Sequence, residues 1–225
     1  MNGPGKIAAI SDVHGMIYKL EALLDVLPIR WGRDQVVFLG DYIDRGPDPR
    51  GVISKLIDIK KNFPNHVNFL LGNHEFMFLN YLFQKGLIDD IPFKSAVNLD
   101  PTFFATGGEN TLASYHRGGE GLVVPDEHME FLLELLPIYE TDDYCFVHAG
   151  LKPHSDIASQ TLDDILWIRY EFIESDYDWG KTVVFGHTPL SSPLVHAKKI
   201  GIDTGAVYGG PLTAVILPDL EFVQV

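Results

Sequence analysis

The chain has 225 residues, of which 46% are hydrophobic and 21% charged, so it is long enough for one domain with a sizeable core. This composition excludes a disordered chain, a collagen-like chain and a coiled coil. Acidic residues outnumber basic ones by 31 to 17, and the net charge of −14 argues against binding to duplex nucleic acid. The single cysteine excludes a disulfide framework and a zinc site built on thiolates.

The first half of the chain alternates short apolar runs with amphipathic segments. Residues 6–11, 35–39 and 66–71 are apolar runs rich in β-forming residues, and each predicts a buried strand. Between them, residues 16–27 and 49–63 carry apolar positions at helical spacing. This alternation with short connections predicts an α/β fold with parallel strand pairing.

The second half begins with a less regular stretch. Residues 76–124 mix aromatic, glycine and polar residues, which predicts a cap-like excursion made of a helical cap and loops. A helix is expected at 125–136, where acidic residues occupy the first turn. Further strands are predicted at 144–147, 182–185, 199–202, 212–217 and 221–225, the last two antiparallel. No repeat or linker interrupts the chain, so one domain over residues 1–225 is expected.

No segment resembles a membrane span or a targeting signal. The apolar runs stay well short of the roughly 20 residues that cross a bilayer. The leading residues, Met-Asn-Gly-Pro-Gly-Lys, lack the charged and apolar regions of a signal peptide, and Ser11 and Asp12 interrupt the one early apolar run. A cytoplasmic protein without membrane partners is therefore expected.

Polar side chains follow five of the predicted strands, at the point where each strand ends. In open α/β sheets, ligands bind outside the carboxyl ends of the strands, so these side chains should share one edge. Taken singly, each motif could be a turn with a capping side chain. Five in order, each directly after an apolar run, favour a binding site. The residues so placed are Asp12, His14, Asp41, Asn73, His148 and His187.

These side chains offer imidazole and oxygen ligands without thiolate. Such ligands suit Mn²⁺, Fe or Zn²⁺ better than Ca²⁺ or Mg²⁺ alone. Six are too many for one catalytic ion with open positions, but they suit two ions that share a bridging carboxylate. The sequence therefore predicts two divalent metal ions, Mn²⁺ first, that bind phosphoryl oxygens and produce hydroxide from water.

The motifs resemble those of the phosphoprotein phosphatase (PPP) branch of the calcineurin-like metallophosphoesterases. The matching sequences, in chain order, are Asp12-Val13-His14-Gly15, Gly40-Asp41-Tyr42-Ile43-Asp44-Arg45-Gly46, Gly72-Asn73-His74-Glu75, His148-Ala149-Gly150 and Gly186-His187. They span most of the chain, and the second is the most specific. The position two residues after His187, which often holds a further metal ligand in the wider superfamily, is Pro189 here. The resemblance implies a β-sandwich of mixed sheets flanked by helices (α/β/β/α).

The resemblance also implies a role for each motif residue. Asp12 and His14 would hold the first ion, Asp41 would bridge both, and the second ion would be completed by Asn73, His148 and His187. Arg45, Arg169 and Asn73 would bind the substrate phosphate. His74 would be the general acid and Asp44 its orienting partner, since a neighbouring carboxylate favours the protonated imidazole.

Blander alternatives stand beside three of these roles. Arg45 could be a turn residue paired with an acid, and Asp44 could cap the turn before Pro47. Arg169 could pair with a nearby acid such as Glu171 or Glu174.

Residues outside the motifs predict less. Tyr208, in the glycine-rich stretch 202–210, is expected to approach the site. Cys145 is expected to be a small buried residue. Packing is expected for Trp31, Trp167 and Trp179, and a structural or exposed position for His66, His116, His128, His154 and His196.

Two enzymatic functions fit this pattern, and a third reading is non-catalytic. The first is a compact bacterial or phage-type serine/threonine protein phosphatase, in which a metal-bound hydroxide attacks phosphorus directly. The alternative is a hydrolase of dinucleoside polyphosphates such as diadenosine tetraphosphate, and the third reading is a non-catalytic module that binds phosphorylated partners. Residues 76–124 should discriminate, since Phe103, Phe104 and Tyr115 could stack a base or pack under the cap. The expected partner is thus a phosphorylated protein or peptide, or a nucleotide polyphosphate.

Overall fold

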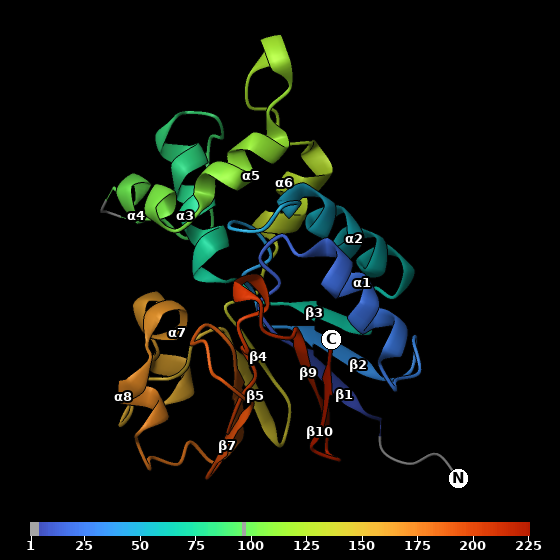
Figure 1. Ribbon diagram of the computed structural model, residues 1–225. Helices are drawn as coiled ribbons and strands as arrows, with labels where there is room; N and C mark the ends of the chain where they lie inside the picture. Colours follow the sequence, from blue (N-terminus) through green and yellow to red (C-terminus); the bar gives the residue numbers. More distant parts are fainter. Residues whose placement is uncertain (1–4, 96–97) are drawn as a thin grey trace.

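The computed structural model describes residues 5–95 and 98–225, in which ten strands form two five-stranded sheets (Figure 1). The first four residues of the leading segment and two residues of 76–124 lie outside the described residues. The first sheet has the order β10-β9-β1-β2-β3, and β1, β2 and β3 run parallel. Its strands are β1 (Ile7–Ile10), β2 (Gln35–Phe38), β3 (Val67–Phe69), β9 (Thr213–Leu217) and β10 (Glu221–Gln224).

The second sheet has the order β4-β5-β6-β8-β7 and combines a parallel centre with antiparallel strands at both edges, whereas the first sheet is antiparallel on the β9 and β10 side only. Its parallel strands are β5 (Tyr144–Val147), β6 (Thr182–Phe185) and β8 (Lys199–Gly201). The edges are β4 (Ile138–Glu140) and β7 (Leu194–His196), neither of which the sequence predicted. Both are three residues long, too short for a clear alternation of apolar and polar residues.

Alternate residues of the strands face opposite layers, as the two-residue period of a strand requires. Ala9 and Val37 of the first sheet share a buried cluster with Phe146 and Val184 of the second, so the two sheets pack face to face. The neighbouring residues Ala8, Ile10, Val36 and Phe38 belong to the other buried cluster, with the apolar side chains of the helices.

Helices cover the outer faces of both sheets. Figure 1 shows α1 (Ile17–Val26) and α2 (Pro49–Asn62) along the first sheet, and α7 (Leu162–Trp167) and α8 (Tyr170–Ile173) beside the second. The α/β/β/α arrangement expected from the resemblance is confirmed. The antiparallel pairing of the last two strands is confirmed as well.

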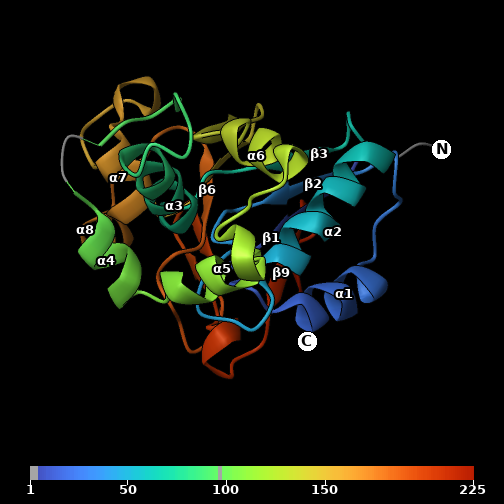
Figure 2. The same cartoon turned by 90° about the horizontal axis from the view of Figure 1, so that it is seen from above.

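The described residues of 76–124 lie at the top of the view in Figure 1, and the view from above shows them spread over both sheets and not over the first alone (Figure 2). They include most of α3 (Asn73–Gln84), then α4 (Asp100–Ala105), α5 (Gly108–Tyr115) and the short η1 (Gly118–Glu120). Phe103 and Tyr115 are buried against Phe78 of α3, with ring centroids 5.9 and 6.1 Å away. Of the two alternatives for these aromatics, Phe103 and Tyr115 therefore pack, whereas Phe104 stays 44% exposed.

The helix predicted at 125–136 is shorter in the structure, where α6 is Asp126–Leu133. The backbone N–H of Leu136 instead donates to Phe69 at 2.9 Å, and its carbonyl accepts from Leu71 at 2.7 Å. This pairing with the end of β3 withdraws Leu136 from the helix. The remaining short helices are η2 (Ile157–Ser159) and η3 (Ala206–Tyr208). Among the described residues, no helix has both the length and the apolar character to cross a membrane.

Candidate metal centre

The carboxyl ends of β1, β2, β3, β5 and β6 meet at one edge, called here the strand-end rim. All six predicted metal ligands are buried there, and none is more than 6% exposed. Several rim residues adopt left-handed backbone conformations that non-glycine residues rarely adopt. Such strain is a feature of functional sites, where the surrounding structure maintains it. The residues are His14, Asp41, Asp44, Arg45 and His187, with φ between 44° and 68°.

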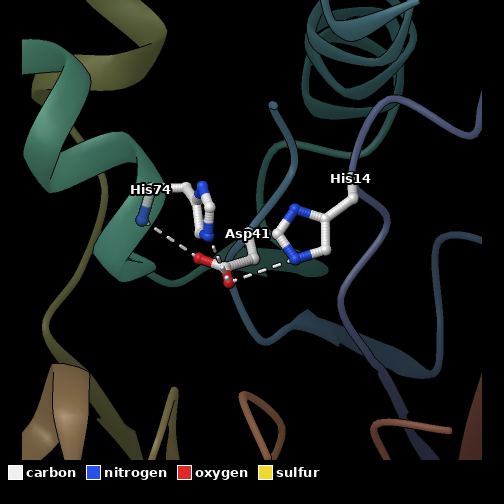
Figure 3. Close-up of side chains that lie close together, drawn as sticks. All are labelled: His14, Asp41 and His74. Atoms are coloured by element: carbon white, nitrogen blue, oxygen red, sulfur yellow. Dashed lines mark hydrogen bonds and ion pairs between the residues drawn. The ribbon is translucent and has the colours of Figure 1, made fainter. Parts of the chain in front are cut away.

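Asp41 lies at the centre of this rim, between two imidazole rings. Its Oδ2 lies 3.4 Å from Nε2 of His14, and its Oδ1 lies 3.4 Å from Nε2 of His148. Figure 3 shows the first of these contacts and the backbone N–H of His74, which donates to Oδ1 at 3.2 Å. One carboxylate oxygen faces each histidine, which is the arrangement of a carboxylate that bridges two ions.

The tautomers of His14 and His148 follow from their hydrogen bonds. Nδ1 of His14 donates to the carbonyl of Ile43, and Nδ1 of His148 donates to that of Leu39, each at 2.8 Å. A carbonyl can only accept, so the hydrogen lies on Nδ1 and the lone pair lies on Nε2 in each neutral ring. Burial lowers the pKa of both imidazoles, which keeps them neutral. Nε2 is therefore the candidate metal-binding atom of both rings; in His14 it accepts from Nη1 of Arg45 at 2.6 Å, a hydrogen bond that a bound ion would replace.

Two further observations fit a cation at this place. Nε2 of His187 is buried without a hydrogen-bond partner among the described residues. Nε2 of His148 lies 2.9 Å from Oδ1 of Asn73, so two acceptors face each other with no proton between them. A divalent cation would satisfy all of these atoms, whose donors are the imidazole and oxygen types that Mn²⁺, Fe and Zn²⁺ accept.

The charges of the rim point the same way. Burial raises the pKa of Asp12 to about 6 and that of Asp41 to about 7, because a buried carboxylate without its hydration is costly. Asp12 keeps two donors, Ser11 Oγ at 2.8 Å and the backbone N–H of His187 at 2.9 Å. Divalent cations would restore the charged form of both carboxylates, so the residues present fit a metal centre.

His74 and Asp44 form a close pair. Nδ1 of His74 lies 2.5 Å from Oδ2 of Asp44, and both side chains are buried. Burial raises the pKa of Asp44 to about 7, whereas burial and the charge of Arg45 lower the pKa of His74 well below its usual value. The expectation was a carboxylate that favours a charged imidazole; here burial opposes the charge on both side chains, which lie in hydrogen-bond contact.

The two phosphate-binding arginines predicted from the sequence differ in their surroundings. Nη1 of Arg45 lies 2.6 Å from Nε2 of His14, and its Nε donates to the carbonyl of Thr106 at 3.3 Å. Arg169 is exposed, and no hydrogen bond or ion pair of its guanidinium occurs in the described part of the chain. The alternative for each arginine, a pairing with an acidic side chain, is absent from the described residues. The charge of Arg169 nevertheless lowers the pKa of His187, after the larger effects of burial and His148, so it lies beside the rim.

Three residues around the rim were not predicted as site residues. Glu75 is buried and accepts the backbone N–H groups of Asp41 at 2.9 Å and Tyr42 at 2.8 Å, which holds the β2 turn. Its position in the Gly-Asn-His-Glu motif was the available signal. Asp203 is buried near Asp12, and burial raises its pKa to about 8. Thr111 of α5 forms hydrogen bonds with Asp44, and no sequence pattern marked it.

The residues expected to be structural behave so where contacts are resolved. Nδ1 of His128 lies 2.8 Å from the hydroxyl of Tyr115. Trp31 stacks on Phe63 at 5.0 Å, and burial raises the pKa of Cys145 to about 12. Trp167 was expected only to pack, but its ring centroid lies 6.2 Å from that of His187 at the rim. Tyr208 reaches the site as expected, with its ring centroid 5.5 Å from Cζ of Arg45.

Comparison with known proteins gives consistent results. The sequence model of the calcineurin-like phosphoesterases matches residues 5–217. The chain is 30% identical to bis(5'-nucleosyl)-tetraphosphatase PrpE [asymmetrical] of Oceanobacillus iheyensis, over 98% of this chain and 92% of that protein.

Two solved structures share the fold. One, provisionally named a diadenosine tetraphosphatase, has a TM-score of 0.71 at 24% identity and covers 100% of this chain and 94% of its own. A serine/threonine phosphatase of Saccharomyces cerevisiae has a TM-score of 0.60 at 13% identity, covering 98% and 79%. Because the family match extends over nearly the whole chain and its metal motifs meet at one rim, the protein belongs to the calcineurin-like phosphoesterases and is a phosphoester hydrolase.

Proposed function

We propose that this protein hydrolyses dinucleoside polyphosphates such as diadenosine tetraphosphate at a centre of two divalent metal ions. The similarity to PrpE over almost the full length of both chains carries the proposal. It favours the alternative drawn from the sequence over the preferred protein serine/threonine phosphatase. The yeast phosphatase shares the fold, which both activities can use.

The proposed metal ligands are those predicted from the sequence. Two groups of buried side chains have potential ligand atoms within 4.8 Å of one another: His14, Asp41 and His74 in one, and Asp41, His148 and His187 in the other. Of these, His74 is proposed as the proton donor and the others as ligands. Asp41 belongs to both, which suits its proposed bridging role. Two bound ions, Mn²⁺ being the first candidate, would supply Lewis acidity toward phosphoryl oxygens and lower the pKa of the attacking water.

The remaining side chains of the rim have separate tasks in this proposal. Arg45 and Arg169 bind phosphoryl oxygens, since a guanidinium matches two such oxygens at once. The His74–Asp44 pair holds a proton that Nε2 of His74 gives to the departing oxygen as the P–O bond breaks. General acids of this kind typically contribute about 10²–10⁴-fold in rate.

Tyr208 supports a nucleotide substrate over a phosphopeptide. The ring is 63% exposed beside Arg45, so a base attached to a bound phosphate chain could stack on it. Its loop is fixed, because Nζ of Lys19 donates to the carbonyl of Ala206 at 3.1 Å and the Asp203 carboxylate accepts from the Gly205 N–H at 2.9 Å. A fixed aromatic ring can stack without a further ordering cost.

The test compares substrates on metal-stripped protein supplied with Mn²⁺. The kcat/KM for diadenosine tetraphosphate should exceed that for phosphoserine, phosphothreonine and phosphotyrosine peptides by at least about tenfold, the worth of one stacked base. Preference for the peptides would support the protein phosphatase and contradict the proposal.

Variants of Tyr208 test the base contact separately. Tyr208→Ala should raise KM for the dinucleotide about tenfold and leave p-nitrophenyl phosphate unaffected, because only the former has a base to stack. Tyr208→Phe should keep the wild-type KM, as should Tyr18→Ala, which removes a tyrosine of similar exposure (56%) on α1. An equal loss on both substrates would show that Tyr208 instead positions Arg45.

A further inference from the structure

The junction of α4 and α5, together with the first turn of α5, contacts the Asp44–Arg45 turn. This clamp segment, residues 106–111, lies about sixty positions further along the chain. The backbone N–H of Arg45 donates to the carbonyl of Gly107 at 3.2 Å, and Nδ2 of Asn110 donates to the Arg45 carbonyl at 2.5 Å. Together with the bond from Arg45 Nε to Thr106, these contacts hold a turn whose two residues both have positive φ.

Thr111 makes the closest contact of the clamp segment with the proton-donating pair. Its hydroxyl donates to Oδ1 of Asp44 at 2.5 Å and accepts the backbone N–H of Asp44 at 2.9 Å. Thr111 and Asp44 are both fully buried. The hydroxyl of Thr111 thus bridges the carboxylate and the backbone N–H of Asp44. Oδ1 of Asp44 contacts Thr111, and Oδ2 contacts Nδ1 of His74.

The backbone of the clamp segment must come very close to the turn for these contacts to form. Gly107 has φ of 97°, and a Cβ at this position would lie 2.9 Å from the backbone nitrogen of Arg45. A side chain there would therefore push the segment away from the turn. The glycine explains how a helix outside the sheets reaches the centre of the rim.

We infer that Thr111 is a positioning residue for proton donation by the His74–Asp44 pair. The inference rests on the proposed role of this pair as general acid, and not on which phosphoester is the natural substrate. Without the hydroxyl, the Asp44 carboxylate can rotate away from Nδ1 of His74, and the imidazole loses the partner that orients it. The clamp segment then supports catalysis through Asp44 and His74, without itself contacting the substrate.

This role has a signature that a purely structural role lacks. A poor leaving group needs its oxygen protonated as the P–O bond breaks, whereas p-nitrophenolate departs without a proton. Phenyl phosphate and p-nitrophenyl phosphate have nearly the same shape and differ in this need. Misplacing the acid should therefore slow the first much more than the second.

The experiment uses Thr111→Val, which keeps the shape of the side chain and removes the hydroxyl, in the full chain loaded with Mn²⁺. We expect kcat for phenyl phosphate to fall about 30-fold, a partial loss of general acid catalysis, and kcat for p-nitrophenyl phosphate to fall less than about threefold. Metal content should remain that of wild type. Thr111→Ser, which restores the hydroxyl, should recover most of the loss.

The matched control is Thr213→Val, a buried threonine whose hydroxyl lies 2.5 Å from that of Thr204. Thr213→Val should leave kcat for phenyl phosphate and kcat for p-nitrophenyl phosphate at their wild-type values. Equal losses of Thr111→Val on both phenyl esters, or no rescue by Thr111→Ser, would overturn the inference. If Thr111→Val does not fold, Thr111→Ala serves for the same comparison. Because both substrates are simple monoesters, failure to cleave diadenosine tetraphosphate would affect the proposed function alone.

Discussion

The two ends of β2 carry two aspartates of equal burial and opposite electrostatics. Asp34 directly precedes the strand and Asp41 follows it, and each is 2% exposed. Hydrogen bonds from Arg30 hold the pKa of Asp34 well below its usual range. Burial instead raises the pKa of Asp41 to about 7, which the charge of Arg45 only partly opposes.

The difference lies in how strongly burial raises each pKa and in the donors that the chain itself provides. Asp34 accepts from the backbone N–H of Lys6 at 3.1 Å and that of Arg30 at 2.7 Å, and from the Arg30 guanidinium at 2.6 Å. Asp41 accepts the backbone N–H of His74 at 3.2 Å and otherwise faces Nε2 of His14 and of His148, which carry no hydrogen in these neutral rings. A buried carboxylate satisfied from within stabilises the fold, whereas one that faces other acceptors needs a cation from outside.

The largest expected effect comes from replacing Asp41, the aspartate at the rim. Asp41→Asn removes the proposed bridge between the ions. The activation free energy should therefore rise by several kcal/mol, and kcat should fall on the order of 10³-fold. Bound Mn²⁺, measured by elemental analysis, should fall as well. The metal-free variant should melt no lower than metal-free wild type, because an uncompensated buried charge has been removed. Full metal content with full activity would exclude Asp41 as the bridge.

A smaller effect separates metal binding from proton donation at the same rim. His74→Asn should lower kcat for phenyl phosphate about 10²-fold, because the proposed proton donor is gone. Elemental analysis should find nearly the wild-type metal content, since His74 is proposed as the acid and not as a ligand. Unchanged kcat would remove His74 from the mechanism, and loss of metal would make it a ligand.

The pH dependence of stability sharpens the comparison without mutation. A carboxyl with a raised folded pKa stabilises the fold below its unfolded value, near about 4, and this contribution is lost as pH rises toward the folded value. With Asp12 at about 6 and Asp41 at about 7, these two carboxyls should lower the stability of the metal-free protein between about pH 4 and 7, whereas the buried histidines of lowered pKa act in the opposite direction. The stability of metal-free wild type relative to metal-free Asp41→Asn, in which the histidine contributions cancel, should therefore fall as pH rises over this range. Excess Mn²⁺ should reverse this loss. Thermal melting of wild type and Asp41→Asn at several pH values, with and without Mn²⁺, is the measurement, and a metal-free difference in Tm between the two that does not change over this range would contradict it.

The rim was predictable because strand ends and motif residues coincide in the sequence. Asp12, Asp41 and His148 each follow an apolar run within a few residues, so their convergence follows from parallel strands. The contacts of Thr111 were not predictable, because its partner Asp44 lies 67 positions away and no periodicity links the two. The same reason hides β4 and β7, which become strands only by pairing with β5 and β8.

Asp34 was also missed, since an aspartate before a strand reads as an ordinary turn residue. Its role appears only when Lys6 and Arg30 are brought beside it in space. Chemistry carried by a short motif is therefore readable from one sequence, whereas the contacts that support it depend on tertiary structure.

The smallest expected effect comes from replacing Asp34, the aspartate that precedes β2. Asp34→Asn replaces a carboxylate oxygen by an amide that cannot accept from Arg30, so stability at neutral pH should fall by about 1–3 kcal/mol. Because the folded pKa of Asp34 is lowered, its contribution is present above the unfolded value and is lost as pH falls below about 4. The wild type and the variant should thus converge in acid when their unfolding by urea is compared. Asp25→Asn, at an exposed position of α1, should match wild type throughout. Activity should be unchanged in both variants, and a fall in kcat with Asp34→Asn would show that the two ends of β2 are not independent.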